Sequence, residues 1–233
     1  MASKIKVDTL ETANGSGSIT INNPINTAGI TSVTLGTGNF VAGATAGDSI
    51  VSGGNYNTLV GDNAGTAVTT GDQNTAVGSY SLVSNTTGNG NTAVGQASLY
   101  NNTTAANNAA LGLSALEANT TGTDNVAVGS QALKANTTGA NNVAVGFDSL
   151  YTNTTGHENS AVGRQSLKLN TTGYNLTASG YAALRDNTTG ADNVGVGTYA
   201  LTNNTTASNN TAVGYYALFT NTTGAQNVAV GAT

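Results

Sequence analysis

The sequence contains no cysteine, no tryptophan, a single proline and few charged residues. Without cysteine, the 233-residue chain has no disulfide, no thiolate metal site and no cysteine nucleophile. Only 7% of its residues are charged, against about 25% in typical globular proteins. The stability of the folded chain must therefore come from apolar packing and backbone hydrogen bonds.

Basic clusters and long apolar runs are also missing. Six Lys and Arg against eleven Asp and Glu give a net charge of −5, which argues against nucleic-acid binding through phosphates. No apolar run approaches the roughly 20 residues that span a bilayer, so we expect no membrane insertion. Residues 1–8 lack the apolar stretch of a secretory signal, so export by that route is not expected.

What the chain has in abundance is one phrase, Asn-Thr-Ala-Val-Gly, repeated with variations at a fixed spacing. A fixed period of this size is the signature of a solenoid, and its strictness argues against disorder. Each final glycine stands 17 positions after the one before it: Gly61, Gly78, Gly95, Gly112, Gly129, Gly146, Gly163, Gly180, Gly197, Gly214 and Gly231.

The repeat unit reads Asn-x-Ala-Val-Gly-x-x-Ala/Ser-Leu-x-x-Asn-Thr-Thr-Gly-x-x. Helical solenoids need about 33 residues or more per unit, and Gly, Asn and β-branched residues would destabilise a helix here. The unit instead fits a strand at Thr/Val-Ala-Val, a glycine bend, a second short strand around Ala-Leu and an Asn-Thr-Thr-Gly turn. The predicted fold is all-β, a parallel β-solenoid (β-roll or β-helix) of 17-residue coils stacked about 4.8 Å apart.

The chain divides into three predicted segments. Residues 1–40 do not follow the repeat, and alternating apolar residues such as Ile19 and Ile21 predict a β-rich segment that attaches the protein to a larger particle. Residues 41–56 are interpreted as capping or transition coils, because terminal repeats of solenoids are often atypical. Residues 57–233 form the repeat solenoid.

The strand positions are assigned to two sides. Alternate residues of a strand face opposite ways, so the residues flanking Ala, such as Val126 and Val128, share a side that we expect inside the coil with the unbroken leucine column. The Ala position never enlarges, which indicates that another chain packs closely against it. The predicted seam between chains consists of Ala76, Ala93, Ala110, Ala127, Ala144, Ala161, Ala178, Gly195, Ala212 and Ala229.

Two asparagine columns have a structural and a functional interpretation. Structurally, Asn accepts unusual turn backbone angles and, when stacked, hydrogen-bonds from coil to coil. Functionally, each Asn-Thr-Thr is an acceptor sequence for N-glycosylation. Their regular place at an obligatory turn favours the structural interpretation.

Aromatic residues occupy the variable positions. Exposed aromatics on rigid coils can stack on sugars, but shielding of neighbouring coils or subunit seams is the favoured interpretation. The surface-binding candidates are Tyr80, Tyr100, Phe147, Tyr151, Tyr181, Tyr199, Tyr215, Tyr216 and Phe219.

No pattern of catalytic or metal-binding residues emerges. His157 is the sole histidine, and the adjacent Glu158 is a poor acid–base partner because neighbouring strand side chains point apart. The acidic residues scatter over several columns, and the Gly-Gly-x-Gly-x-Asp calcium repeat is missing. We therefore expect no enzymatic activity, catalytic residue, metal site or cofactor.

The phrase Asn-x-Ala-Val-Gly-x-x-Ala/Ser, as in residues 125–132, resembles the head repeat of trimeric autotransporter adhesins. Those heads are left-handed parallel β-rolls in which three chains associate side by side and bind host surfaces. The resemblance covers roughly residues 57–233 and implies a side-by-side homotrimer. The adhesin unit is shorter and lacks the Asn-Thr-Thr insertion.

The longer unit and the opening residues 1–20 look like tail-fibre and other virion fibre proteins of bacteriophages. This resemblance implies a structural virion protein with residues 1–40 on other tail proteins and a host-surface glycan or protein as its outside partner. The missing secretory signal and membrane anchor favour it over an autotransporter. The alternatives are an exported bacterial surface adhesin or extracellular fibre, and an ice-binding β-solenoid, which would need alternating rather than adjacent Thr residues.

Overall fold

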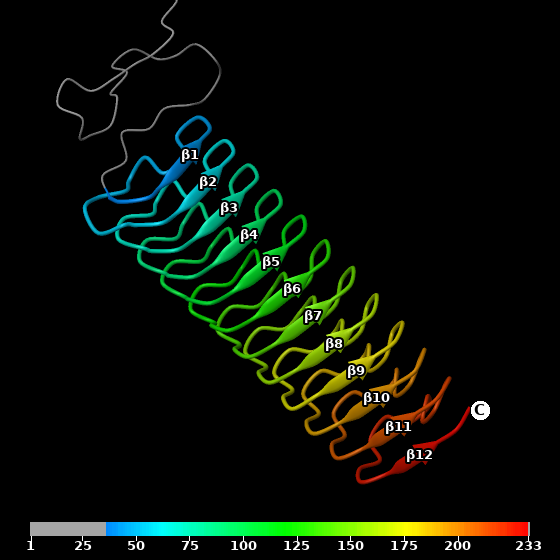
Figure 1. Ribbon diagram of the computed structural model, residues 1–233. Coiled ribbons are helices and arrows are strands. Elements are labelled where there is room, and N and C mark those ends of the chain that lie inside the picture. The colour runs from blue at the N-terminus through cyan, green and yellow to red at the C-terminus, as the bar shows by residue number, and fades with distance from the viewer. Residues whose placement is uncertain (1–35, 233) are drawn as a thin grey trace, which may run out of the picture.

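The computed structural model describes residues 36–232. They form an all-β solenoid in which twelve parallel strands make one sheet in sequence order (Figure 1). This confirms the predicted fold class; of the expected attachment segment 1–40, residues 1–35 lie outside the described residues. The strands are β1 (Phe40–Ala42), β2 (Thr58–Val60), β3 (Thr75–Val77), β4 (Thr92–Val94), β5 (Ala109–Leu111), β6 (Val126–Val128), β7 (Val143–Val145), β8 (Ser160–Val162), β9 (Thr177–Ser179), β10 (Val194–Val196), β11 (Thr211–Val213) and β12 (Val228–Val230).

The strands pair in strict register. From β2 onward each residue pairs with the residue 17 positions ahead, as Val126 does with Val143. In the first pair the paired residues are 18 positions apart instead of 17, since Phe40 in β1 pairs with Thr58 in β2. The extra residue lies in the turn after Val51, whose backbone N–H donates to the carbonyl of Thr69, 18 positions ahead. The predicted 17-residue register is thus confirmed, and one longer coil precedes it.

Each coil has one strand; the second strand expected around Ala-Leu is a turn. In the β6 coil the chain reverses through left-handed residues, with φ of 61° at Gln131, 51° at Leu133 and 58° at Asn141. The backbone still hydrogen-bonds to both neighbouring coils. Leu133 N–H donates to the carbonyl of Ser149 in the next coil, and Gln131 N–H donates to the carbonyl of Leu113 in the preceding coil. These left-handed residues turn the chain back on itself, so the coil closes without a second strand.

The glycine that ends each phrase is required by its backbone and its surroundings. Gly129 has a φ of 133°, a conformation that side chains with a Cβ rarely adopt. A Cβ there would lie 2.6 Å from the carbonyl oxygen of Gly146 in the next coil. Any larger residue would therefore force the stacked coils apart.

The leucine column forms the core, as predicted. These leucines are fully buried from the third coil to the tenth, and Leu218 in the next coil is partly buried. The buried members are Leu82, Leu99, Leu116, Leu133, Leu150, Leu167, Leu184 and Leu201.

The predicted orientation of the strand is wrong. The alanine column, assigned above to a seam between chains, is fully buried inside its own coil from Ala76 to Ala212, and Gly195 is buried as well. The flanking residues that were expected inside, such as Val126, face outward. Only Ala229, in the final strand, is partly exposed. The alanine column therefore cannot be a contact between chains.

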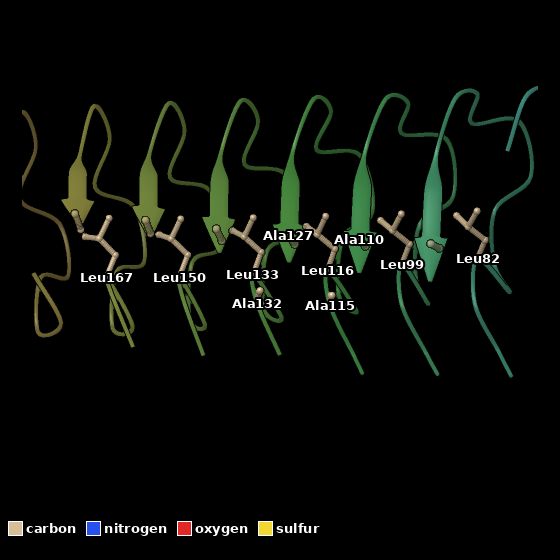
Figure 2. Packing of buried hydrophobic residues seen from close by; sticks show 14 of the residues in the cluster. Leu82, Leu99, Ala110, Ala115, Leu116, Ala127, Ala132, Leu133, Leu150 and Leu167 are labelled. Atoms are coloured by element: carbon tan, nitrogen blue, oxygen red, sulfur yellow. The ribbon is translucent and has the colours of Figure 1, made fainter. Parts of the chain in front are cut away.

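The narrow interior explains this orientation. Figure 2 shows the leucine side chains in a row along the inner side of the strands, beside the alanines. At Gly195, an added Cβ would already lie 3.2 Å from the Cγ of Leu184. In the coils of β3 to β11, which carry a leucine at the column position, a valine could not share this space, so the strand turns its Ala or Gly inward.

Truncating a core leucine should destabilise the solenoid strongly. We expect Leu150→Ala to lower the free energy of unfolding by about 2–5 kcal/mol, because it removes buried methyl groups and leaves a cavity. Lys134→Ala, on the solvent-exposed side of the coil, should change it by less than about 0.5 kcal/mol. Urea unfolding followed by circular dichroism measures both, and equal midpoints would contradict the core assignment.

Enlarging the alanine column should destabilise the single chain itself. Ala127→Leu should cost about 1–3 kcal/mol of unfolding free energy, because the added methyl groups overpack the narrow interior. The matched control is Val126→Leu, which changes the adjacent outward residue of the same strand. If both variants unfold at the wild-type urea concentration, the alanine does not face the interior.

Candidate functional surface

Each coil presents three surfaces. The strand face consists of the two outward residues of every strand, exemplified by Val126 and Val128. The turn face consists of residues 137–141 and their equivalents. The variable face consists of the outward residues within 130–135 and their equivalents, and it carries all nine predicted aromatic candidates.

Two asparagine ladders run through the coil interior behind the turn face. In the first, Asn125 donates its backbone N–H to Oδ1 of Asn108 (3.0 Å) and its Nδ2 to the carbonyl of Gly139 (2.9 Å). In the second, Asn136 Nδ2 donates to Oδ1 of Asn119 (2.8 Å) and to the same Gly139 carbonyl (2.9 Å). One carbonyl therefore joins both ladders across the coil.

The ladders support the structural interpretation of the asparagines. Asn136 is fully buried, and its Nδ2, the atom that an N-linked glycan would occupy, is engaged in two hydrogen bonds. Glycosylation of the folded coil would break both bonds and bring the residue to the surface. The Asn-Thr-Thr sequences are thus explained by the coil's own hydrogen bonding.

The first ladder is interrupted once, at Leu176. Its backbone N–H still donates to Oδ1 of Asn159 (3.0 Å), but its side chain offers no acceptor to Asn193 in the next coil. Leu176 is buried in the hydrophobic core, and β9 keeps its register with both neighbouring strands. Strand pairing and core packing with the neighbouring coils therefore keep the coils stacked where one asparagine of the ladder is replaced.

Five of the predicted surface residues form one cluster, the aromatic patch, on the variable face near the C-terminal end of the rod. The rings of Tyr199 and Tyr216 are 4.8 Å apart, and Tyr181 meets Tyr199 edge-on at 5.1 Å. Tyr215 and Tyr181 are 54% and 37% exposed. The aromatic patch consists of Tyr181, Tyr199, Tyr215, Tyr216 and Phe219.

Two of the tyrosine hydroxyls in the aromatic patch, those of Tyr199 and Tyr216, have a raised pKa. A side-chain hydrogen bond with Tyr181 raises the pKa of Tyr199, and burial together with the charge of Tyr215 raises the pKa of Tyr216. Beside the patch, the Arg185 guanidinium donates two 2.7 Å hydrogen bonds to the Asp186 carboxylate, which raise the pKa of Arg185. The patch is thus a surface of aromatic rings and hydroxyls with a paired charge at its side.

The remaining candidates lie in smaller groups. Tyr80 and Tyr100 form a separate pair with ring centroids 6.3 Å apart. Phe147 connects indirectly to the aromatic patch, because the Arg164 guanidinium lies 5.7 Å from its ring and 5.9 Å from the ring of Tyr181. The sequence analysis did not single out Arg164, although it occupies the same repeat position as Phe147 and Tyr181.

Tyr151 belongs to a cluster with two charged residues. The Lys168 ammonium lies 5.7 Å from its ring centroid and 2.9 Å from Oδ2 of Asp148. Asp148 is buried, and its Oδ1 has no hydrogen-bond partner in the described structure. The ion pair of Lys168 with Asp148 links two adjacent coils, but the cluster offers no second group for acid–base chemistry.

One aromatic stack escaped the sequence analysis. His157 and Tyr174, on the turn side of adjacent coils, lie with their rings parallel and 5.2 Å apart. The two residues occupy the same repeat position in successive units, so their contact was predictable from the 17-residue spacing between them. His157 thus contacts a ring rather than an acidic partner.

The described part of the chain offers little other chemistry. Among residues 36–232, no three His, Asp or Glu side chains gather where they could hold a metal ion. No helix in the same range is long and apolar enough to cross a membrane.

Comparison with known proteins returns nothing. No family model, no curated protein and no solved structure matches this chain. The proposals below therefore depend on the repeat geometry, on the surfaces just described and on the resemblance of the repeat phrase.

Breaking the second asparagine ladder should destabilise the rod. In Asn136→Ala, Oδ1 of Asn119 loses its donor inside the coil, so we expect a loss of about 1–3 kcal/mol of unfolding free energy. The control Thr138→Ala, at an exposed position of the same turn, should change it by less than about 0.5 kcal/mol. Chemical unfolding of the two variants compares them directly, and equal stability would show that the ladder contributes nothing.

Proposed function

We propose that this chain is a structural fibre protein of a bacteriophage virion that mediates or supports attachment to the host surface. The observation that carries the proposal is the rod itself, in which every coil repeats its neighbour in register. Eleven coil intervals at about 4.8 Å give a length of about 53 Å. Such a rod holds variable side chains at fixed positions along its length, which is what an attachment fibre requires.

The aromatic patch is the surface we propose for contact with a host glycan or protein. Tyrosine combines a large rigid ring with a hydroxyl, and it therefore supplies contact area at a low cost in side-chain entropy. The patch also lies on a backbone that is hydrogen-bonded to the preceding coil, because Tyr199 N–H donates to the carbonyl of Tyr181 and Tyr216 N–H to the carbonyl of Thr198. Binding would thus require little ordering of the protein.

The virion location is supported by the resemblance of the repeat and the opening residues to phage fibres, and the proposed assembly is the homotrimer that the adhesin resemblance implies. An exported bacterial adhesin or extracellular fibre is the second candidate, because a rigid rod with exposed aromatic residues serves it equally well. Either function places the rod outside the cell and leaves the aromatic patch as the contact surface.

The structure gives no support to ice binding. Of the two adjacent threonine columns, one is committed to bonding between coils, since Thr137 Oγ1 donates to the carbonyl of Thr154 in the next coil (3.1 Å). Only the column that contains Thr138 is exposed. A single exposed threonine column does not make the flat, two-column surface that this function needs.

Labelling with antibodies raised against residues 57–233 tests the location. Gold-labelled antibodies should decorate the tails or fibres of phage particles in electron micrographs of the producing culture. Labelling of the bacterial surface in the absence of particles would favour the adhesin instead. Labelling of neither would overturn both candidates.

Removal of residues 1–35 tests the proposed attachment segment. The deletion leaves β1 intact, so we expect a rod with a wild-type circular dichroism spectrum that no longer incorporates into particles. Incorporation is measured by immunoblotting of purified virions that carry the shortened gene. Normal incorporation would show that the attachment segment lies elsewhere.

A further inference from the structure

The strand face forms a continuous uncharged stripe along the rod, apolar on the column of Val128 except at β9 and mixed with Thr and Ser on the column of Val126. Both outward residues of each strand from β2 to β12 are Val, Leu, Ala, Thr or Ser, and none is charged. Large side chains on the stripe remain about two-fifths exposed, as at Val162 (43%) and Leu111 (41%). Its exposed large members are Val77, Val94, Leu111, Val126, Val143, Val162, Val213, Val228 and Val230.

No described segment of the chain covers this stripe. Each coil folds its other walls to the inner side of the strand, where the alanine and leucine columns meet. The stripe is about 53 Å long and about 10 Å wide, which corresponds to about 500 Å². An exposed, largely apolar surface of this size is typical of an interaction site.

We propose that the strand face is the interface between copies of this chain, so that the stripes of the copies in the proposed homotrimer pack against one another. The inference rests on the proposed fibre assembly and places its contact on the valine columns, after the burial of the alanine column excluded the original seam. Two stripes together would bury about 1,000 Å², which reaches the range of specific protein–protein interfaces.

A second copy fits the stripe better than any other occupant. The stripe offers no charge to attract a charged partner, and the column of Val128 is apolar in every strand from β2 to β12 except β9, so it offers a glycan almost no hydrogen-bonding group. A second copy presents an equally long, uncharged stripe with the same spacing between coils. The ridges formed by stacked β-branched residues on one copy can therefore lie in the grooves of the other along the whole length.

The rest of the surface agrees with this arrangement. The ion pairs of Lys134 with Glu117 and of Lys168 with Asp148 lie on the variable face, as does the aromatic patch. Association through the strand face leaves these groups in solvent. The rod thus separates an inward surface for its own copies from an outward surface for other molecules.

Charged substitutions on the stripe test the interface. In light scattering, the wild-type protein should have the mass of an assembly of several chains of 22.9 kDa each. The variant Val126→Lys/Val162→Lys places buried charges in the interface and should shift the mass to 22.9 kDa, with an unchanged circular dichroism spectrum. The matched control Thr138→Lys/Thr172→Lys places the same charges, two coils apart, on the exposed turn face and should keep the wild-type mass.

A milder pair covers the case in which the charged variant does not fold. Val126→Thr/Val162→Thr keeps the β-branched shape, and Thr already occupies the position equivalent to Val126 in β2, β3 and β4. It should raise the concentration at which the assembly dissociates by about tenfold or more, because methyl groups leave the interface. Assembly of either stripe variant at wild-type concentrations overturns the interface but leaves the fibre proposal standing. A wild-type mass of one chain overturns the interface and the homotrimer, whereas virion labelling decides the fibre function separately.

Discussion

The structure depends on backbone hydrogen bonding between each coil and the coils on both sides of it. This bonding continues beyond the strands: Leu133 donates to the coil ahead and Gln131 to the coil behind, although neither lies in a strand. A coil that pairs around so much of its contour must close after the same number of residues as its neighbours. The 17-residue period is the consequence, and the longer coil at β1 accommodates its extra residue in a turn.

Strict stacking means that side chains meet their own equivalents, and this determines which residues a column can contain. Asparagine suits a buried column because its Oδ1 accepts from one neighbour while its Nδ2 donates to another, as Asn136 does with Asn153 and Asn119. Glycine is required where the carbonyl of the next coil approaches within 2.6 Å of a Cβ position, as at Gly129. Leucine is accepted in the left-handed region, at a cost in backbone strain, because its side chain fills the core.

The same stacking separates the surfaces by chemistry. The columns inside the coil cannot vary without loss of packing or of hydrogen bonds, so variation is confined to outward positions. On the variable face it brings the rings of Tyr181, Tyr199 and Tyr216 together from three successive coils. On the strand face it is limited to the uncharged residues Val, Leu, Ala, Thr and Ser. A rod with an uncharged stripe and an aromatic patch on different sides suits an attachment fibre built from several copies, the function proposed here.

The solenoid, the coil length, the leucine core and the asparagine columns were predictable from the sequence, because strict periodicity reports which positions stack. The sequence did not determine which side of Val-Ala-Val faces inward, because alternation defines two sides and both were apolar. Nor did it show that the second strand is replaced by left-handed turns, since left-handed Leu133 carries no local signal in the sequence. The tertiary structure decided both points. From β3 to β11, the space between the strand and the leucine wall is filled by Ala or Gly, so the thickness of the closed coil, which no local pattern encodes, turns the valines outward.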